Sequence, residues 1–282
     1  MPLPPDLRLT QSSLQDYTDC KRRFQLRYLD RLVWPALESE PALIHERYMH
    51  LGAQFHQLVQ QHQLGLPVER LTRLVTDLDL TRWWENYLAH APANLPAKRL
   101  TETVLTASLT GSRILAKYDL LAVAPGRAVI VDWKTSQPGA KRPRRDTLLN
   151  RLQTRVYRYL LVAAGAHLNG GTPFQPEQVE MIYWFAEHPD QPYHFPYTSA
   201  QYRADHEYLS TLIAEIAGEY NRQTLGPLSF PLTPDEKRCA YCPYRSLCDR
   251  GTRAGDLDDW DTDLDEPTAL DFTLEQIAEI EF

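Results

Sequence analysis

Alternating and continuous apolar positions dominate the middle of the chain. Three segments carry this pattern: an alternating one, Thr101–Leu109, and two long apolar runs, Arg113–Val123 and Val129–Thr135. Pro125-Gly126 lies between the two runs and supplies a turn. Apolar runs joined by such a short turn are typical of a β-hairpin. We therefore predict a strand followed by a hairpin, which brings Asp119 close to Asp132.

Helical periodicity precedes and follows these strands. Helices are predicted over Leu14–Tyr28, Gly52–Val59, 66–99, Leu148–Val162 and Ala200–Tyr220, with another strand over Gln178–Phe185. The aromatic residues within 66–99 are expected to be core residues, and residues 34–41 a loop. The mixture predicts an α/β fold, with one domain over residues 1–255 that contains a helical insertion at about 40–99. An acidic tail follows over 256–282.

Charged residues interrupt the second apolar run. Side chains alternate faces along a strand, so Asp132 and Lys134 share one face while Trp133 points away. Each unpaired buried charge costs several kcal/mol, so a partner such as a metal ion is expected. Two carboxylates can hold a hard divalent cation, and Lys134 can orient or deprotonate a water molecule. The alternative is an ion pair on a solvated strand edge, the commoner fate of an isolated Asp-x-Lys.

The pattern of Asp119 followed by Asp132-x-Lys134 resembles the PD-(D/E)XK nuclease superfamily, and Asp132–Thr135 looks like its RecB-type exonuclease branch. The resemblance implies a restriction-endonuclease-like core, a mixed sheet flanked by helices. It also implies metal-dependent cleavage of DNA, at single strands or ends, with Asp119 and Asp132 binding Mg²⁺ or Mn²⁺ and the Trp133 carbonyl contributing. The family often has glycine before its first acid, whereas Ala116-Lys117-Tyr118 stands here and leaves the strand register open.

A histidine motif of the same branch lies upstream. Gly52 and His56, four residues apart, match a glycine-histidine motif, and the resemblance implies that His56 is a metal ligand. His50 and His62 are six residues away on either side, about 240° around a helix. Only one of the three histidines can therefore point at the metal.

Two more features follow Lys134 in the chain. Gln153 and Tyr157 lie on one helical face and match a Gln-x-x-x-Tyr motif that lines the active site in this branch. The loop 137–145 contains helix breakers and four cations, Lys141, Arg142, Arg144 and Arg145. Its position directly after the catalytic strand favours a role in binding DNA phosphates over that of a solvated loop.

The four cysteines form a separate pattern. Cys239, Cys242 and Cys248 are clustered, and Cys20 is expected within the first helix, far upstream. Three clustered thiolates and one distant one can close a tetrahedral sulfur site. The spacing resembles the iron-sulfur site of helicase-nuclease subunits and of the CRISPR adaptation exonuclease family, which implies a 4Fe-4S cluster that staples the two termini together. Zinc would accept the same ligands, and disulfides are the third alternative.

Composition and charge limit the remaining possibilities. The chain has 282 residues, 43% of them hydrophobic, without a signal peptide or a long apolar stretch, so we expect a soluble cytoplasmic protein with no membrane contact. The net charge is -7, but eleven acids and no lysine or arginine lie from Asp256 onward. The remaining 30 basic and 26 acidic residues leave an excess of four positive charges, which is compatible with DNA binding. The acidic tail also carries a possible short helix with Leu274, Ile277 and Ile280 along one stripe.

A rival interpretation is a non-catalytic iron-sulfur subunit that binds DNA or acts as a scaffold in a larger helicase-nuclease complex. The chain has no Gly-x-x-x-x-Gly-Lys-Ser/Thr loop, so a helicase motor, or a CRISPR adaptation protein, is expected as a partner. Because His56, Asp119, Asp132 and Lys134 are all present, the sequence favours the enzyme.

Overall fold

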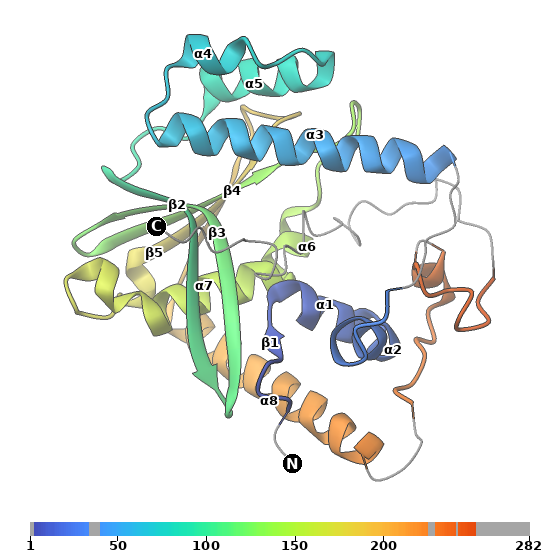
Figure 1. Cartoon of the computed structure of the whole chain (residues 1–282). Coiled ribbons are helices and arrows are strands. Elements are labelled where there is room, and N and C mark those ends of the chain that lie inside the picture. The colour runs from blue at the N-terminus through green and yellow to red at the C-terminus, as the bar shows by residue number, and fades with distance from the viewer. Residues whose placement is uncertain (1–2, 34–39, 225–228, 241, 252–282) are drawn as a thin grey trace, which may run out of the picture.

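A six-stranded mixed sheet lies between two layers of helices (Figure 1). The structure is a computed structural model that describes residues 3–33, 40–224, 229–240 and 242–251. The strands are β1 (Arg8–Leu9), β2 (Lys98–Leu109), β3 (Ser112–Ala124), β4 (Arg127–Lys134), β5 (Val179–Phe185) and β6 (Tyr193–Pro196). Most of the expected loop at 34–41, and the whole acidic tail with its possible helix, lie outside the described residues.

Both parallel and antiparallel pairs occur in the sheet. Its order is β1-β3-β4-β5-β6, and β2 pairs with β3 off this path. The pairs β1·β3 and β4·β5 are parallel, whereas β2·β3, β3·β4 and β5·β6 are antiparallel. The Pro125-Gly126 turn joins β3 to β4, with Gly126 at a φ of +73° that favours glycine. The predicted hairpin and the predicted mixed sheet flanked by helices are confirmed.

Helices cover both faces of the sheet (Figure 1). The α3, α4 and α5 helices cover one face, and α1, α7 and α8 cover the other. The helices are α1 (Gln11–Asp19), α2 (Lys21–Phe24), α3 (Glu40–Gln63), α4 (Val68–Thr72), α5 (Leu78–His90), α6 (Arg145–Asn150), α7 (Leu152–Ala164) and α8 (Ser199–Thr224). A π-helical turn, η1 (Gln25–Leu29), follows α2, and short 3-10 helices are η2 (Gly165–Asn169), η3 (Pro176–Gln178) and η4 (Glu236–Cys239).

Each face of the sheet has its own hydrophobic core. The side chains of Val129, Val131 and Trp133 pack against α3 and α5, in what we name the α3 core. Those of Ala128 and Ile130 pack toward α7 and α8, in the α7 core. This alternation places Asp132 and Lys134 on the α7 side of β4, and the predicted opposition of their side chains to Trp133 is confirmed.

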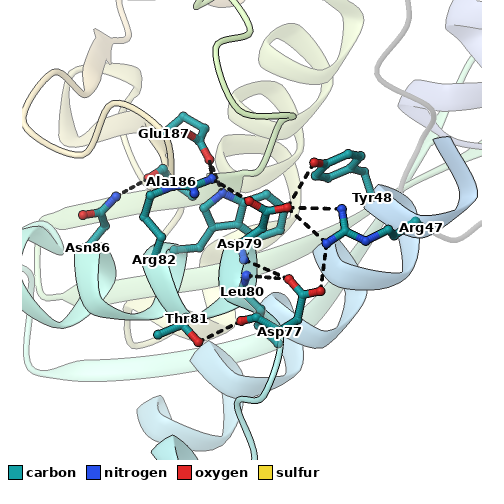
Figure 2. Close-up of polar contacts among 11 residues, drawn as sticks. Arg47, Tyr48, Asp77, Asp79, Leu80, Thr81, Arg82, Asn86, Ala186 and Glu187 are labelled. Atoms are coloured by element: carbon teal, nitrogen blue, oxygen red, sulfur yellow. Dashed lines mark hydrogen bonds and ion pairs between the residues drawn. The ribbon is translucent and has the colours of Figure 1, made fainter. Parts of the chain in front are cut away.

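The aromatic residues of α5 are core residues, as predicted. Trp83, Trp84 and Tyr87 are buried in the α3 core, where Tyr87 lies edge-on to Trp133 with ring centroids 5.5 Å apart. Polar contacts also hold α5 at its outer edge. Figure 2 shows Arg82 of α5 bonded to Glu187, just beyond β5, at 2.6 Å. Its neighbour Asn86 donates to the carbonyl of Ala186 at 2.8 Å.

Three predicted helices are interrupted. The helix predicted over 66–99 is divided into α4 and α5 and ends at His90, before β2 begins at Lys98. The other two are broken beside residues of chemical interest. The first of these ends at Cys20, which is extended (φ -158°, ψ 108°), so Cys20 lies in a break rather than within a helix. The helix predicted over Leu148–Val162 is divided between α6 and α7, because Arg151 is extended (ψ 144°) and separates the two. Both breaks lie beside residues with candidate chemistry, Cys20 itself and Gln153.

The N-terminal helices pack against the C-terminal part of the described chain. The amide of Phe230 donates to Gln25 Oε1 at 2.8 Å, and the amide of Arg22 donates to the Pro231 carbonyl at 3.2 Å. Phe230 also stacks on Phe24, with ring centroids 6.4 Å apart. Among the described residues, no helix combines the length and the apolar composition needed to cross a bilayer.

Candidate active site where β3 and β4 diverge

Asp119 lies at the point where β3 and β4 stop pairing. The last pair of their ladder is Leu120 with Val131, so the amide of Trp133 extends beyond the β3–β4 ladder. That amide donates to Asp119 Oδ2 at 2.9 Å. The carboxylate of one strand thereby takes the place of the missing backbone partner, and this bond holds Asp119 beside the end of β4.

The β2 strand is distorted at the same level. Its ladder with β3 is continuous except that Glu102 and Asp119, which face each other, are not paired. Glu102 has a φ of +52°, a left-handed conformation that costs a non-glycine residue about 1–2 kcal/mol. On β3, Tyr118 packs in the α7 core but Leu120 packs in the α3 core, so the strand exchanges its faces across Asp119.

The α3 helix delivers His56 to Asp119. A Cβ atom on Gly52 would lie 2.9 Å from Thr135 Oγ1, so glycine allows α3 to approach the end of β4 closely. One turn later, His56 Nδ1 is 3.5 Å from Asp119 Oδ2. His50 instead contacts Gln54 at the surface, and His62 contacts the Tyr87 hydroxyl. Only His56 faces the site, as expected for three histidines spaced by six.

Burial and charge act in opposite directions on this pair. Burial alone would lower the pKa of His56, but the adjacent Asp119 carboxylate outweighs it, so the pKa of His56 is raised. Burial would likewise raise the pKa of Asp119, but His56, the Trp133 amide and Lys134 lower it. Asp119 is therefore held as a carboxylate, the form that binds a cation.

Asp132, Lys134 and Gln153 form a closed set of contacts on the other side of β4. Lys134 Nζ lies 3.0 Å from Asp132 Oδ2 and donates to Gln153 Oε1, also at 3.0 Å. Gln153 Nε2 donates to Asp132 Oδ1 at 2.7 Å. Asp132 is only 3% exposed, so these bonds compensate a carboxylate that is almost completely removed from water.

Gln153 owes its position to the break before α7. It is the second residue of α7, which starts after the extended Arg151, so its side chain projects from the beginning of the helix toward β4. Tyr157, one turn further, is buried, and its ring centroid is 4.9 Å from that of Tyr118. Burial and the charges of Asp132 and Asp119 raise the pKa of Tyr157 well above its usual value. Tyr157 is therefore a neutral phenol behind the carboxylates.

Tyr183 was not predicted as a site residue. It lies directly opposite Asp132 in the β4–β5 register and is fully buried. Its hydroxyl donates to Gln153 Oε1 at 3.3 Å, and Lys134 Nζ is 5.3 Å from the centre of its ring. The one signal in the sequence is a hydroxyl group within an otherwise apolar strand. An ordinary tyrosine of the core gives the same signal.

The oxygen donors at this site suit a hard divalent cation. Asp119 and Asp132 project from adjacent strands, and the Trp133 carbonyl directly follows Asp132 in the chain. Among the described residues, no three His, Cys, Asp or Glu side chains are gathered closely enough to hold a metal ion by themselves. Mg²⁺ commonly uses only one or two protein carboxylates and keeps several waters. The pair of carboxylates therefore fits such an ion.

Half of the cations in the loop 137–145 are bound to the protein itself. Arg142 donates to the Gln191 carbonyl and lies 4.0 Å from the centre of the Tyr193 ring. Arg145 donates to the His194 carbonyl at 2.8 Å and lies over Phe195. Lys141 and Arg144 are exposed. The loop is thus fixed on β6 by two arginines and presents two further cations to solvent.

The four cysteines are drawn together from both ends of the chain. Burial raises the pKa of Cys242 to about 11, and the neighbouring Cys20 and Cys248 thiols add to the effect. The pKa of Cys239 is raised for the same reasons. All four cysteines are free thiols in the structure. They are not, however, closed into a group that could hold a metal ion within the described part of the chain.

Comparison with known proteins found a matching family model and similar solved structures. The model of the PD-(D/E)XK nuclease superfamily matches residues 8–249. A crystal structure from Eubacterium rectale, of a protein provisionally assigned as an exonuclease, has a TM-score of 0.46 and 11% identity and covers 74% of this chain and 80% of its own. The structure of SSO0001 has a TM-score of 0.38 and 14% identity and covers 87% of each chain. No curated protein matches the sequence significantly. Because the family model spans most of its length and every element of the site, the chain belongs to the PD-(D/E)XK nuclease superfamily.

Proposed function

We propose that the protein is a metal-dependent deoxyribonuclease, an exonuclease that acts on single-stranded DNA or on DNA ends. The observation that carries the proposal is the contact set of Asp132, Lys134 and Gln153 beside Asp119, at the point where two strands diverge. Membership of the superfamily supports hydrolysis of a phosphodiester bond. The preference for single strands or ends rests on the resemblance to the RecB-type branch.

Asp119, Asp132 and the Trp133 carbonyl would hold Mg²⁺ or Mn²⁺, with His56 completing the site. The bound cation supplies polarisation of the phosphate and acidification of a water molecule. His56 already contacts Asp119 at 3.5 Å, so it limits how far that carboxylate can turn. The burial of Asp132 keeps bulk water away from the carboxylate and strengthens its attraction for a cation.

Lys134 orients or deprotonates the attacking water and offsets the negative charge of the transition state. Gln153 holds the Lys134 ammonium and the Asp132 carboxylate in one fixed arrangement, because its two amide atoms bind one each. Tyr157 packs behind this group and helps to position the water or the DNA. Removal of Gln153 would leave the direct contact between Lys134 and Asp132 without the amide that bridges them.

The exposed Lys141 and Arg144 are the residues of loop 137–145 best placed to bind DNA phosphates. Arg142 and Arg145 contribute by fixing that loop on β6, and their positive charge still adds to the local field. This division predicts that Lys141 and Arg144 affect DNA affinity directly, whereas Arg142 and Arg145 affect it through the loop.

Cys20, Cys239, Cys242 and Cys248 are proposed to hold a 4Fe-4S cluster. Their mutual effect on thiol pKa supports proximity, and the contacts of Phe230 and Arg22 support the joining of the two ends of the chain. Zinc is the competing occupant, and a colourless protein after anaerobic purification would favour it. A helicase or a CRISPR adaptation protein is the proposed partner, and the cytoplasm the proposed location.

Incubation with linear single-stranded DNA tests the function. The wild-type protein is expected to degrade it with Mg²⁺ or Mn²⁺ but not with EDTA, and Asp132→Ala is expected to abolish degradation. His50→Ala, a change on the solvent-facing side of the same helix as His56, serves as the matched control and should retain full activity. Equal activity of wild type and Asp132→Ala would refute the assignment of the site. DNA binding without metal-dependent cleavage by the wild type would favour the non-catalytic subunit.

A further inference from the structure

We propose that Tyr183 is a positioning residue for the reaction, acting through Lys134 and Gln153; this inference rests on the proposed nuclease function. Tyr183 belongs to β5 and lies beneath both residues. Its hydroxyl is 3.3 Å from Gln153 Oε1, and the centre of its ring is 5.3 Å from Lys134 Nζ. One buried side chain therefore contacts the two groups that flank Asp132.

Two hydrogen bonds anchor the hydroxyl of Tyr183, and the position of the Thr154 proton decides their direction. Thr154 Oγ1 lies 2.5 Å from the carbonyl of Leu148, which can only accept, so the Thr154 proton is used there. Thr154 Oγ1 and the Tyr183 hydroxyl are 2.8 Å apart, so Tyr183 must be the donor and Thr154 Oγ1 the acceptor of this hydrogen bond. The single Tyr183 proton is shared between Thr154 Oγ1 and Gln153 Oε1, so the phenol is held from two sides.

The ring of Tyr183 acts on Lys134 by a different interaction. An ammonium group near the face of an aromatic ring is attracted by the quadrupole of that ring, and more strongly where water is excluded. The side chain of Lys134 is only 11% exposed, and Tyr183 is fully buried. The ring therefore limits where the ammonium can move when it is not bound to Asp132 or Gln153.

This series of hydrogen bonds also extends toward loop 137–145. Leu148 belongs to α6, which directly follows loop 137–145, and Thr154 belongs to the first turn of α7. The bonds from Leu148 through Thr154 and Tyr183 to Gln153 thus link the helix after the proposed DNA-binding loop to the side chain that holds Lys134. Of the residues in this series, Tyr183 also contacts Lys134 through its ring.

Steady-state cleavage of single-stranded DNA by Tyr183→Phe and Tyr183→Leu tests the proposal. Tyr183→Phe removes one neutral hydrogen bond and keeps the ring, so kcat should fall about tenfold while KM stays within about twofold. Tyr183→Leu also removes the ring and should lower kcat further. Tyr159→Phe is the matched control, because it removes a buried hydroxyl bonded to His206 on the α8 side, and it should leave kcat unchanged.

The double variant Tyr183→Phe/Gln153→Ala separates positioning from general stability. If Tyr183 acts through Gln153, the double variant should be no slower than Gln153→Ala alone. Multiplied losses in the double variant, or an unchanged kcat in Tyr183→Phe beside an active wild type, would overturn the inference and leave the nuclease function intact. An inactive wild type would instead overturn the proposed function, and this inference with it.

Discussion

The active site and the cysteine region are assembled in different ways. Every group of the active site lies on a regular element or directly beside one, and its position is fixed by the register of β3, β4 and β5 and by the approach of α3. Three of the four cysteines lie instead at the end of η4 and in the turns after it, and Cys20 lies in a helix break. The sheet therefore builds one site, whereas local turns and side-chain ion pairs build the other.

Ion pairs within the N-terminal helices, and one between the two ends of the chain, support the cysteine region. Arg23 lies 2.8 Å from Asp16 and 3.1 Å from Asp19, and Arg238 lies 2.6 Å from Asp19. Asp16 and Asp19 are both buried, so these pairs are screened little by water. The site fixed by strand register thus has its side chains already in contact, whereas the cysteines on the turns and at the helix break are not gathered closely enough, among the described residues, to hold a metal ion.

The largest effect is expected in the cysteine region. Cys20→Ser should abolish iron binding and lower the free energy of unfolding by several kcal/mol, because metal binding at such a site is part of the folding free energy. Asp19→Asn is the control, since it weakens the ion pairs to Arg23 and Arg238 but keeps all four thiols. It should retain iron. Iron analysis and urea unfolding measure both effects, and full iron occupancy in Cys20→Ser would remove Cys20 from the cluster.

A smaller effect is expected where α3 meets the sheet. In Gly52→Ala, the new Cβ would lie 2.9 Å from Thr135 Oγ1, on a short and stiff side chain, so α3 and His56 must shift. We expect a loss of at least about tenfold in activity and about 1–3 kcal/mol in stability. Gly218→Ala, in α8, is the control: its nearest new contact is 3.9 Å, and it should slightly stabilise the protein. Equal activity and stability of the two variants would contradict the close approach of α3 to the end of β4.

The smallest effect is expected at the strand distortion beside Asp119. Glu102→Gly relieves the left-handed conformation and should raise the free energy of unfolding by at most about 1 kcal/mol, with activity retained. Glu102→Val disfavours that conformation and should lower activity by moving Asp119. Glu102→Asn, which tolerates a positive φ but removes the charge that pairs with Lys117, is the control. Higher activity in Glu102→Val than in Glu102→Gly would show that the distortion does not position Asp119.

Side chains that share a face because of their spacing along one strand or helix could be predicted from the sequence. The exchange of faces along β3 could not. Alternation along β4 placed Asp132 and Lys134 on one face, and spacing by four placed Gln153 with Tyr157 and Gly52 with His56. The exchange of faces at Asp119 leaves no local signal, because Glu102 occupies an ordinary position in an alternating segment. Its positive φ accompanies the missing pair between Glu102 and Asp119 in the β2–β3 ladder.

Tyr183 and the two helix breaks illustrate the same limit. A tyrosine within a buried strand has the pattern of a core residue, and only the parallel register with β4 places it opposite Asp132. Cys20 and Arg151 have no glycine or proline beside them to mark a break. After the break at Cys20, α2 packs against Phe230, which is far away in the sequence.

The central claim is that this site cleaves DNA rather than only binding it, and Lys134→Ala tests that claim most directly. Single-turnover cleavage and equilibrium binding of the same single-stranded DNA should be measured on one preparation, with Mg²⁺ for cleavage and Ca²⁺ for binding. We expect cleavage to fall about 10²–10⁴-fold while DNA affinity stays within about threefold, because Lys134 acts on the water and the transition state. Cleavage at the wild-type rate with unchanged affinity would contradict the claim.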